Sequence, residues 1–175
     1  LQSSFSVNSI ALVKGRPMLL NLHDMVANFI EHRMDVVIRR TKYDLRKAEE
    51  RAHILEGLII AVDNIDEVVR IIRASRTPAE AQSNLEARFG LDNLQSKAIV
   101  DMRLSQLTGL RIEELKQEYA KLQELIQYLN ELLNNETKRY EVIENELVEI
   151  KEKYADERRT RIIKMATEFN PEDMY

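Results

Sequence analysis

Residues 30–62 read IEHRMDVVIRRTKYDLRKAEERAHILEGLIIAV, and this stretch decides the fold. Apolar or small side chains recur along it at intervals of three and four residues, with one irregular step near Thr41. Such spacing lines up one stripe along a helix and is typical of a coiled coil. At 1.5 Å per residue the striped helix extends for roughly 50 Å. The stripe consists of Ile30, Met34, Val37, Thr41, Leu45, Ala48, Ala52, Leu55, Ile59 and Val62.

A second stripe lies in the C-terminal half of the chain. It alternates steps of three and four over residues 112–133, pauses at 134–137 (NNET), and resumes over 140–154. Residues 33–51 carry seven basic and four acidic side chains, whereas residues 113–157 carry thirteen acidic and six basic ones. Opposite charges beside facing stripes favour pairing. We therefore expect one long helix out and a broken helix back, which together form an antiparallel arm.

Between the two stripes, the sequence has the texture of short helices with good caps. Residues 77–80 (TPAE) and 92–95 (DNLQ) are capping boxes, in which side chains satisfy the free backbone donors of a first helical turn. The helix opened by the second box is expected to carry Leu107 and to stop at Thr108-Gly109. We expect three short helices that form a compact globular knob.

The first twenty residues differ from the rest because they alternate at near strand period around a turn at 14–17 (KGRP). A lone hairpin is marginal in water, and the chain begins without Met. We expect a piece of a larger protein, whose hairpin packs on the first helix or joins a larger sheet. The predicted fold is mainly α, with a hairpin stub at 1–20, an outgoing helix at 21–62, the knob at 63–110, a returning broken helix at 111–157 and a tail at 158–175.

The composition excludes several classes of protein. With 4 Gly and 3 Pro in 175 residues, the chain lacks the turns of β-sandwiches and of Gly-rich phosphate loops. The absence of Cys removes disulfides, thiolate zinc sites and cysteine nucleophiles. The histidines lack metal-ligand spacing, so we expect no catalytic, metal-binding or cofactor-binding residue. No apolar run approaches the ~20 residues of a membrane span, and we expect a cytoplasmic protein without a membrane partner.

The basic segment has two interpretations. Arg33, Arg39 and Arg40 are candidates for a surface that faces DNA. However, the basic residues are spread around the helix, which favours simple charge complementarity with the acidic returning helix. Tyr43 stands alone as an aromatic, so interleaved platforms for base stacking are missing.

The knob is better explained by self-association than by catalysis. Three short helices cannot easily hide Ile99, Met102, Leu104, Leu107 and Leu110 at the end of a long arm. A two-fold contact between two knobs would bury that surface. The competing interpretation is that the knob's own core absorbs these side chains.

Several runs carry a resemblance to the A subunits of bacterial DNA gyrase, a family of type IIA topoisomerases. Residues 45–58 (LRKAEERAHILEGL), preceded by 39–41 (RRT), resemble the long coiled-coil helix of that family. Residues 63–68 (DNIDEV) and 72–75 (IRAS) resemble the segment that follows, 95–110 (QSKAIVDMRLSQLTGL) is similar to the knob helix, and 156–160 (DERRT) resembles the end of the returning arm. The resemblance covers essentially the whole chain. Topoisomerase IV is close, but the DMRL and LTGL runs are more similar to gyrase.

The resemblance implies a role in dimerisation. In this family the coiled-coil arms end in knobs that dimerise and form the exit gate, or C-gate, for a transported DNA duplex. It also implies a parent enzyme that acts on double-stranded DNA as an A2B2 complex with the gyrase B protein, which supplies ATP and Mg²⁺ chemistry. The implied dimer-interface positions are Leu94, Ile99, Met102, Arg103, Leu104, Leu107 and Leu110.

The same resemblance implies what the chain lacks. The family's catalytic tyrosine has an Ala-Ala-x-Arg-Tyr context, and none of the six tyrosines here has it. We therefore expect no DNA cleavage, ligation or supercoiling by this chain alone. Asn134 and Asn135 are candidate hinge residues that allow the arm to bend. The alternative functions are a generic antiparallel coiled-coil scaffold for a partner protein, or the equivalent piece of topoisomerase IV.

Overall fold

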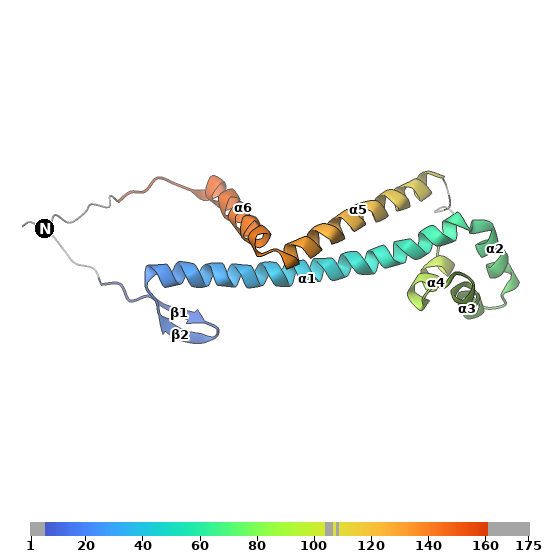
Figure 1. Ribbon diagram of the computed structural model, residues 1–175, viewed down its shortest axis with the longest axis horizontal. Helices are drawn as coiled ribbons and strands as arrows, with labels where there is room; N and C mark the ends of the chain where they lie inside the picture. Colours follow the sequence, from blue (N-terminus) through green and yellow to red (C-terminus); the bar gives the residue numbers. More distant parts are fainter. Residues whose placement is uncertain (1–5, 104–106, 108, 161–175) are drawn as a thin grey trace, which may run out of the picture. The chain divides into compact units, whose positions relative to one another are not determined.

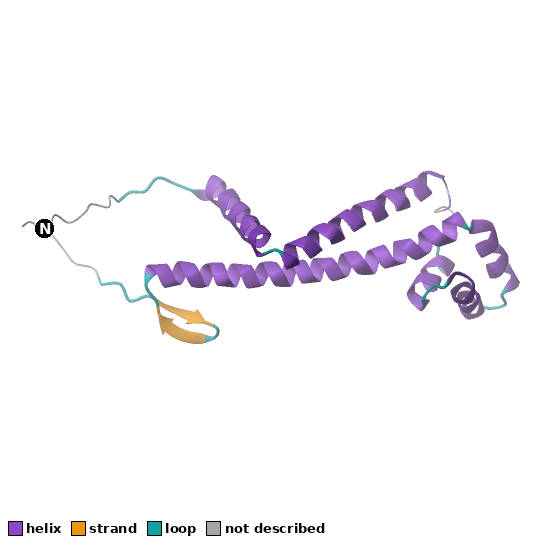
Figure 2. Cartoon of the chain, viewed as in Figure 1, coloured by secondary structure: helices purple, strands orange, loops and turns teal. Residues whose placement is uncertain are grey.

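The computed structural model describes residues 6–103, 107 and 109–160, apart from the side chain of Leu110. Two strands and six helices appear there in the order β1 (Ile10–Val13), β2 (Arg16–Leu19), α1 (Leu22–Asp63), α2 (Ile65–Ala74), α3 (Pro78–Phe89), α4 (Asn93–Val100), α5 (Gly109–Asn134) and α6 (Glu136–Tyr154). Figures 1 and 2 show this order along the chain. The chain divides after Ile143 into two compact units. The mainly helical fold with an N-terminal hairpin confirms the expected fold class.

The hairpin turns within two residues. β1 and β2 pair antiparallel, with Val13 opposite Arg16, so the loop consists of Lys14 and Gly15 alone. Both have positive φ angles, 50° and 79°, as a type I′ turn requires. The predicted four-residue turn was therefore too long, because Arg16 and Pro17 already belong to β2. Proline is tolerated there because a strand of a two-stranded sheet is an edge strand.

Helix α1 is the longest element of the first unit. Its first turn is capped by Asn21, whose Oδ1 accepts from the Asp24 backbone N–H at 2.8 Å. The predicted stripe is confirmed, since its members are buried or half-buried along the helix. Thr41, the polar member of the stripe, is buried, and its Oγ1 donates to the Val37 carbonyl at 2.8 Å. The seam thus accommodates a hydroxyl without leaving it unpaired.

Helix α5 returns along α1 (Figure 1). Its stripe is half-buried, and Leu129 and Leu132 are fully buried near its C-terminal end. The ion pair between Arg51 and Glu118 joins α1 to α5. The predicted antiparallel pairing of the outgoing and returning helices is therefore confirmed for α5. In α6, Ile143 is buried whereas Tyr140 is exposed, and the pairing of residues 144–154 stays a prediction.

Helices α2, α3 and α4 build the predicted three-helix knob around the end of α1. Its core consists of Ala61 from α1, Val68, Leu85, Leu91 and Ile99. Partly buried Leu58 and Ile60 of α1 pack against this cluster. The last turns of the long helix therefore supply one wall of the knob's core.

The predicted third helix of the knob was too long. Helix α4 ends at Val100, and Asp101 is its C-cap, with Met102 and Arg103 following in non-helical backbone. Gly109 was expected to stop a helix, but it is the first residue of α5. Glycine is tolerated at either end of a helix, so the residue type alone does not show whether a helix ends or begins at Gly109.

Candidate functional site

The structure sorts the predicted interface residues into different environments. Leu94, in the first turn of α4, is 62% exposed. Ile99 is 2% exposed and belongs to the knob's core, whereas the prediction placed it on the surface that contacts a partner. Met102 and Leu107 are half-buried, and Arg103 is exposed. Leu104 and the side chain of Leu110 lie outside the described residues.

The knob is fastened to the arm through the capping box of α4. Asp92 Oδ1 accepts from the Gln95 backbone N–H at 2.8 Å, and Gln95 Oε1 accepts from the Asp92 backbone N–H at 3.2 Å. The same two side chains reach α1: Asp92 Oδ2 lies 2.6 Å from His53 Nε2, and Gln95 Nε2 donates to the His53 carbonyl at 2.9 Å. One local motif therefore both starts α4 and attaches it to the long helix.

Gly57 allows this attachment. It is buried in the middle of α1, where a glycine costs ~1 kcal/mol relative to alanine. A Cβ atom placed on Gly57 would lie 2.7 Å from Gln95 Cβ and 2.8 Å from its Cγ. The glycine is thus explained by the close approach of α4 to α1, and not by a bend in the helix.

The electrostatics of the attachment favour an ionised Asp92. The hydrogen bond from the Gln95 backbone N–H, and then that from His53, lower the pKa of Asp92 below its ordinary value. An anion at the start of a helix is also stabilised by the helix dipole. His53 has a structural role here, because its Nε2 lies within hydrogen-bond distance of Asp92.

Further charged contacts hold the knob's helices together. Arg88 of α3 donates to both carboxylate oxygens of Glu67 in α2, at 2.7 and 3.2 Å. This bidentate contact lowers the pKa of Glu67. Ser96 Oγ of α4 donates to Glu86 of α3 at 2.7 Å. Polar contacts therefore link α2 to α3 and α3 to α4 around the apolar core.

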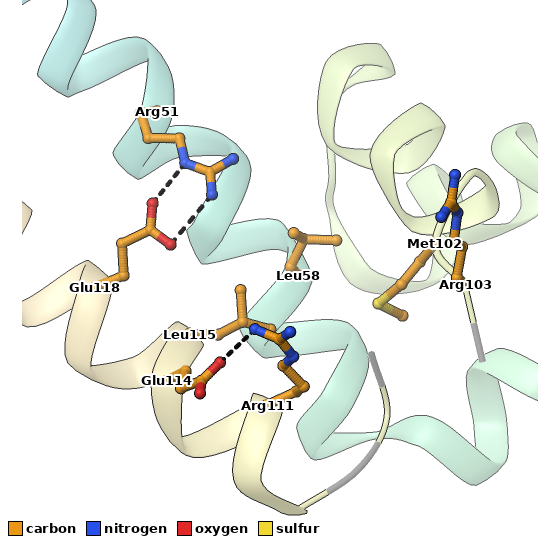
Figure 3. A pocket seen from close by; sticks show the side chains of 8 residues that line it. All are labelled: Arg51, Leu58, Met102, Arg103, Arg111, Glu114, Leu115 and Glu118. Atoms are coloured by element: carbon orange, nitrogen blue, oxygen red, sulfur yellow. Dashed lines mark hydrogen bonds and ion pairs between the residues drawn. The ribbon is translucent and has the colours of Figure 1, made fainter. Parts of the chain in front are cut away.

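A cavity of about 480 Å³ lies where the knob meets the arm (Figure 3). Figure 3 shows Arg51 facing Glu118 and Arg111 facing Glu114 across its wall. Arg51 donates to the two Glu118 oxygens at 2.8 and 3.1 Å. Four of the five charged side chains in the lining are thus matched in pairs, and Arg103 is the fifth. Its lining is Arg51, Leu58, Met102, Arg103, Arg111, Glu114, Leu115 and Glu118.

The candidate DNA-facing residues lie on α1. Arg39 pairs with Asp35 one turn earlier, at 3.0 Å. Arg33 is half-buried and Arg40 is exposed. Ion pairs within the helix therefore balance part of the basic charge, whereas the pair of Arg51 with Glu118 has the cross-helix sense that charge patterning predicted. A role of these arginines toward DNA stays a prediction.

The interruption expected at residues 134–137 is present between α5 and α6. Helix α5 ends at Asn134, and Asn135 Oδ1 accepts from the Lys138 backbone N–H at 3.3 Å. Arg139, which sequence reasoning did not single out, donates to carbonyls of α5 across the break. A hinge at Asn134 and Asn135 stays a prediction.

The described residues offer no metal site and no membrane span. Within 6–103, 107 and 109–160, no three His, Cys, Asp or Glu side chains come together as ligands. None of the helices in this part of the chain has the length and apolar character needed to cross a bilayer.

Comparison with known proteins gives a consistent result. The family of the A subunits of DNA gyrase/topoisomerase IV matches residues 1–148. The DNA gyrase A protein of Deinococcus deserti is 47% identical over 99% of the chain, which corresponds to 22% of that relative. The gyrase A proteins of Ureaplasma parvum and Staphylococcus epidermidis are 50% and 51% identical over 93% of the chain, or 19% and 18% of the relatives. The chain thus spans about a fifth of the relatives it matches.

Proposed function

The chain belongs to the family of DNA gyrase/topoisomerase IV A subunits, and we propose that it is the part of that protein that joins two copies at the C-gate. The knob is the joining element and the α1–α5 pair is the arm that carries it. Two chains associated through their knobs close the exit for a transported duplex.

The observation that carries the proposal is that the knob has its own core and its own attachment while Leu94 stays outside. The core cluster and the Asp92–His53 contact fix the three short helices against the end of α1. Leu94 lies in sequence between Asp92 of the attachment and Ile99 of the core, yet it is 62% exposed. A large apolar side chain at the start of a rigidly held helix is suited to a two-fold contact.

The wider activity of the parent protein follows from family membership. We propose that the parent is the A component of a type IIA topoisomerase, which works with the gyrase B protein on double-stranded DNA in the cytoplasm. ATP and Mg²⁺ belong to the B component in this scheme, and we propose that this piece of the A component supplies no catalytic residue. Arg33, Arg39 and Arg40 are the residues of α1 proposed to face the duplex.

Sedimentation equilibrium with matched variants tests the dimerisation role. Leu94→Glu changes an exposed leucine of the knob, whereas Leu125→Glu changes an exposed leucine of α5. The unmodified chain and Leu125→Glu are expected to sediment as dimers, and Leu94→Glu as a monomer of 20.5 kDa. Met102→Glu and Leu107→Glu are expected to weaken the dimer as well.

Other outcomes distinguish the alternatives. A monomer at every concentration for the unmodified chain contradicts the proposal and favours a coiled-coil scaffold for a different partner. A dimer that Leu125→Glu dissociates and Leu94→Glu does not would place the contact on the arm. A steep loss of DNA affinity with added salt, removed by replacing Arg39 and Arg40, would support a DNA-facing role for α1.

A further inference from the structure

Arg139 bridges the interruption between α5 and α6. Its Nη1 donates to the carbonyls of Leu132 and Leu133, at 3.0 and 2.6 Å, and its Nε lies 3.3 Å from the sulfur of Met34 in α1. The side chain is half-buried. One guanidinium from the first turn of α6 therefore contacts the last turn of α5 and the long helix beside it.

The two carbonyls that Arg139 binds are carbonyls that lose their backbone N–H partners at the break. In an uninterrupted α-helix the carbonyls of Leu132 and Leu133 accept from the backbone N–H groups four residues later, those of Glu136 and Thr137. These two N–H groups instead belong to the first turn of α6, where donors have no partner within the helix. The guanidinium thus replaces the backbone donors that the interruption removes.

Two further contacts belong to the interrupted form. Asn135 Oδ1 accepts from the Lys138 backbone N–H, as an N-cap residue does. Lys138 Nζ pairs with Glu131, seven residues earlier, although charged pairs on an uninterrupted helix join residues three or four apart. Glu131 raises the pKa of Lys138 in this arrangement. The interruption is therefore held by side chains from both helices.

We propose that residues 131–139 form an elbow with two hydrogen-bonded states, and that Arg139 sets the balance between them. In the interrupted state Arg139 binds the Leu132 and Leu133 carbonyls and Asn135 caps α6. In the continuous state the backbone N–H groups of Glu136 and Thr137 take over these carbonyls and Arg139 is released. The two hydrogen bonds from Arg139 thus stand in for the two backbone hydrogen bonds that the Leu132 and Leu133 carbonyls would accept in the continuous state.

The local sequence keeps the two states close in free energy. Asn134, Asn135 and Thr137 are poor helix formers, which disfavours the continuous state. The helical hydrogen bond from the Asn135 N–H to the Glu131 carbonyl, at 2.9 Å, persists up to the break. Conversion to the continuous state therefore requires new backbone hydrogen bonds over one helical turn only. The elbow is a property of this chain and holds whether or not the knobs dimerise. If they do, it is the point at which the arm bends.

Paired spin labels measure the elbow directly. The chain has no Cys, so Gln117→Cys on α5 and Glu149→Cys on α6 give two unique labels. These exposed positions are 32 residues apart, which corresponds to about 48 Å on a continuous helix. Labelled chain is diluted with unlabelled chain so that only distances within one chain are recorded. The wild type is expected to show a component shorter than 48 Å, and Arg139→Met to shift the distribution toward 48 Å.

Amide hydrogen exchange supplies a second measure. Arg139→Met is expected to slow exchange at Glu136 and Thr137 by at least tenfold, because their N–H groups regain carbonyl partners. Arg111→Met is the matched control, since it removes an exposed arginine of α5 that pairs with Glu114, three residues later on the same helix. It should change neither measurement. Arg139→Lys retains a donor and is expected to give an intermediate distribution.

The proposal is overturned if Arg139→Met leaves both the label distances and the exchange rates at wild-type values. It is also overturned if the wild type shows only the 48 Å component. Should Arg139→Met lose its helical circular dichroism, Asn135→Ala takes its place, because it removes the cap of α6 without touching the guanidinium. Asn135→Ala is expected to shift the distances in the same direction, and an unchanged distribution contradicts the two-state elbow.

Discussion

Replacing Gly57 by alanine tests the close contact that attaches the knob to the arm. Helix propensity alone predicts that this change stabilises α1 by ~1 kcal/mol. The structure predicts the opposite sign, because the new methyl group would lie 2.7 Å from Gln95 Cβ and 2.8 Å from Gln95 Cγ. These contacts are far inside van der Waals distance, and one of them is to an atom fixed directly on the backbone of α4.

The magnitude follows from the two ways in which the collision can be relieved. Extra volume in a packed site costs about 1–3 kcal/mol through strain. If α4 moves away instead, the hydrogen bond from Gln95 Nε2 to the His53 carbonyl is lost, at about 1 kcal/mol. After subtracting the propensity gain of ~1 kcal/mol from these costs, Gly57→Ala is expected to lower the free energy of unfolding by up to about 2 kcal/mol.

Urea unfolding followed by circular dichroism provides the assay. Gly109→Ala is the matched control, since among the described residues nothing beyond its own helical turn and chain neighbours lies within 4 Å of the Cβ it would add, and it should be neutral or slightly stabilising. In a Gln95→Gly background, which removes the atoms that collide, Gly57→Ala should become stabilising by up to ~1 kcal/mol. A Gly57→Ala protein that is more stable than wild type in the Gln95 background would refute the close-approach explanation.

Two further perturbations have definite signs. The pKa of Asp92 is lowered in the fold, so its contribution to stability is present above the unfolded-state pKa of about 3.9 and is lost as the pH falls through the lower folded-state value. In urea unfolding, the difference in unfolding free energy between wild type and Asp92→Asn should therefore shrink between pH 7 and pH 3. A difference that stays constant over this range would contradict the assignment. The pair of Arg51 with Glu118 is about half exposed, so Glu118→Gln should cost less than ~1 kcal/mol, and less still in 1 M salt, as thermal melts at two salt concentrations would show.

The long-range outline of the fold was predictable because it depends on periodicity. The stripe from Ile30 to Val62 and the stripe of α5 each repeat at helical spacing over many turns, so a local irregularity such as the one near Thr41 does not change the predicted helix. The predicted caps Thr77 and Asp92 also identified where α3 and α4 begin, since capping acts within four residues. Asp92 forms the full capping box, whereas beside Thr77 the Glu80 side chain accepts from the Arg76 N–H.

What the sequence could not show depends on contacts between distant residues. From the sequence of α1 alone Gly57 is only a cost, because the partner that requires it, Gln95, is 38 positions away and its approach depends on tertiary packing. The end of α4 was placed too late because Met102 and Leu107 continue the apolar pattern although the backbone leaves the helix after Val100. An Asp-x-x-Gln cap near a helix with an interior glycine is the signal that could have suggested the attachment.

Arg139 was missed for a related reason. A basic residue in an acidic helix is ordinarily a solvated surface charge, and nothing in its sequence neighbourhood distinguishes it from Lys138. Its role comes from carbonyls exposed by the break at Asn135, which local propensity did predict. The location of the interruption was thus readable, whereas the side chain that holds it was not.

The central claim, that two chains meet through their knobs, is tested most directly by spin-label distances between chains. Ser83→Cys places one label on an exposed position of α3 in the knob, and Gln123→Cys places one on α5. A knob of this size has a radius of gyration of about 10 Å, so two labels on touching knobs lie within about 50 Å of each other. We predict a dipolar signal in that range for Ser83→Cys that disappears on adding Leu94→Glu. A dimer in which the Gln123 labels are close and the Ser83 labels give no signal would contradict the account.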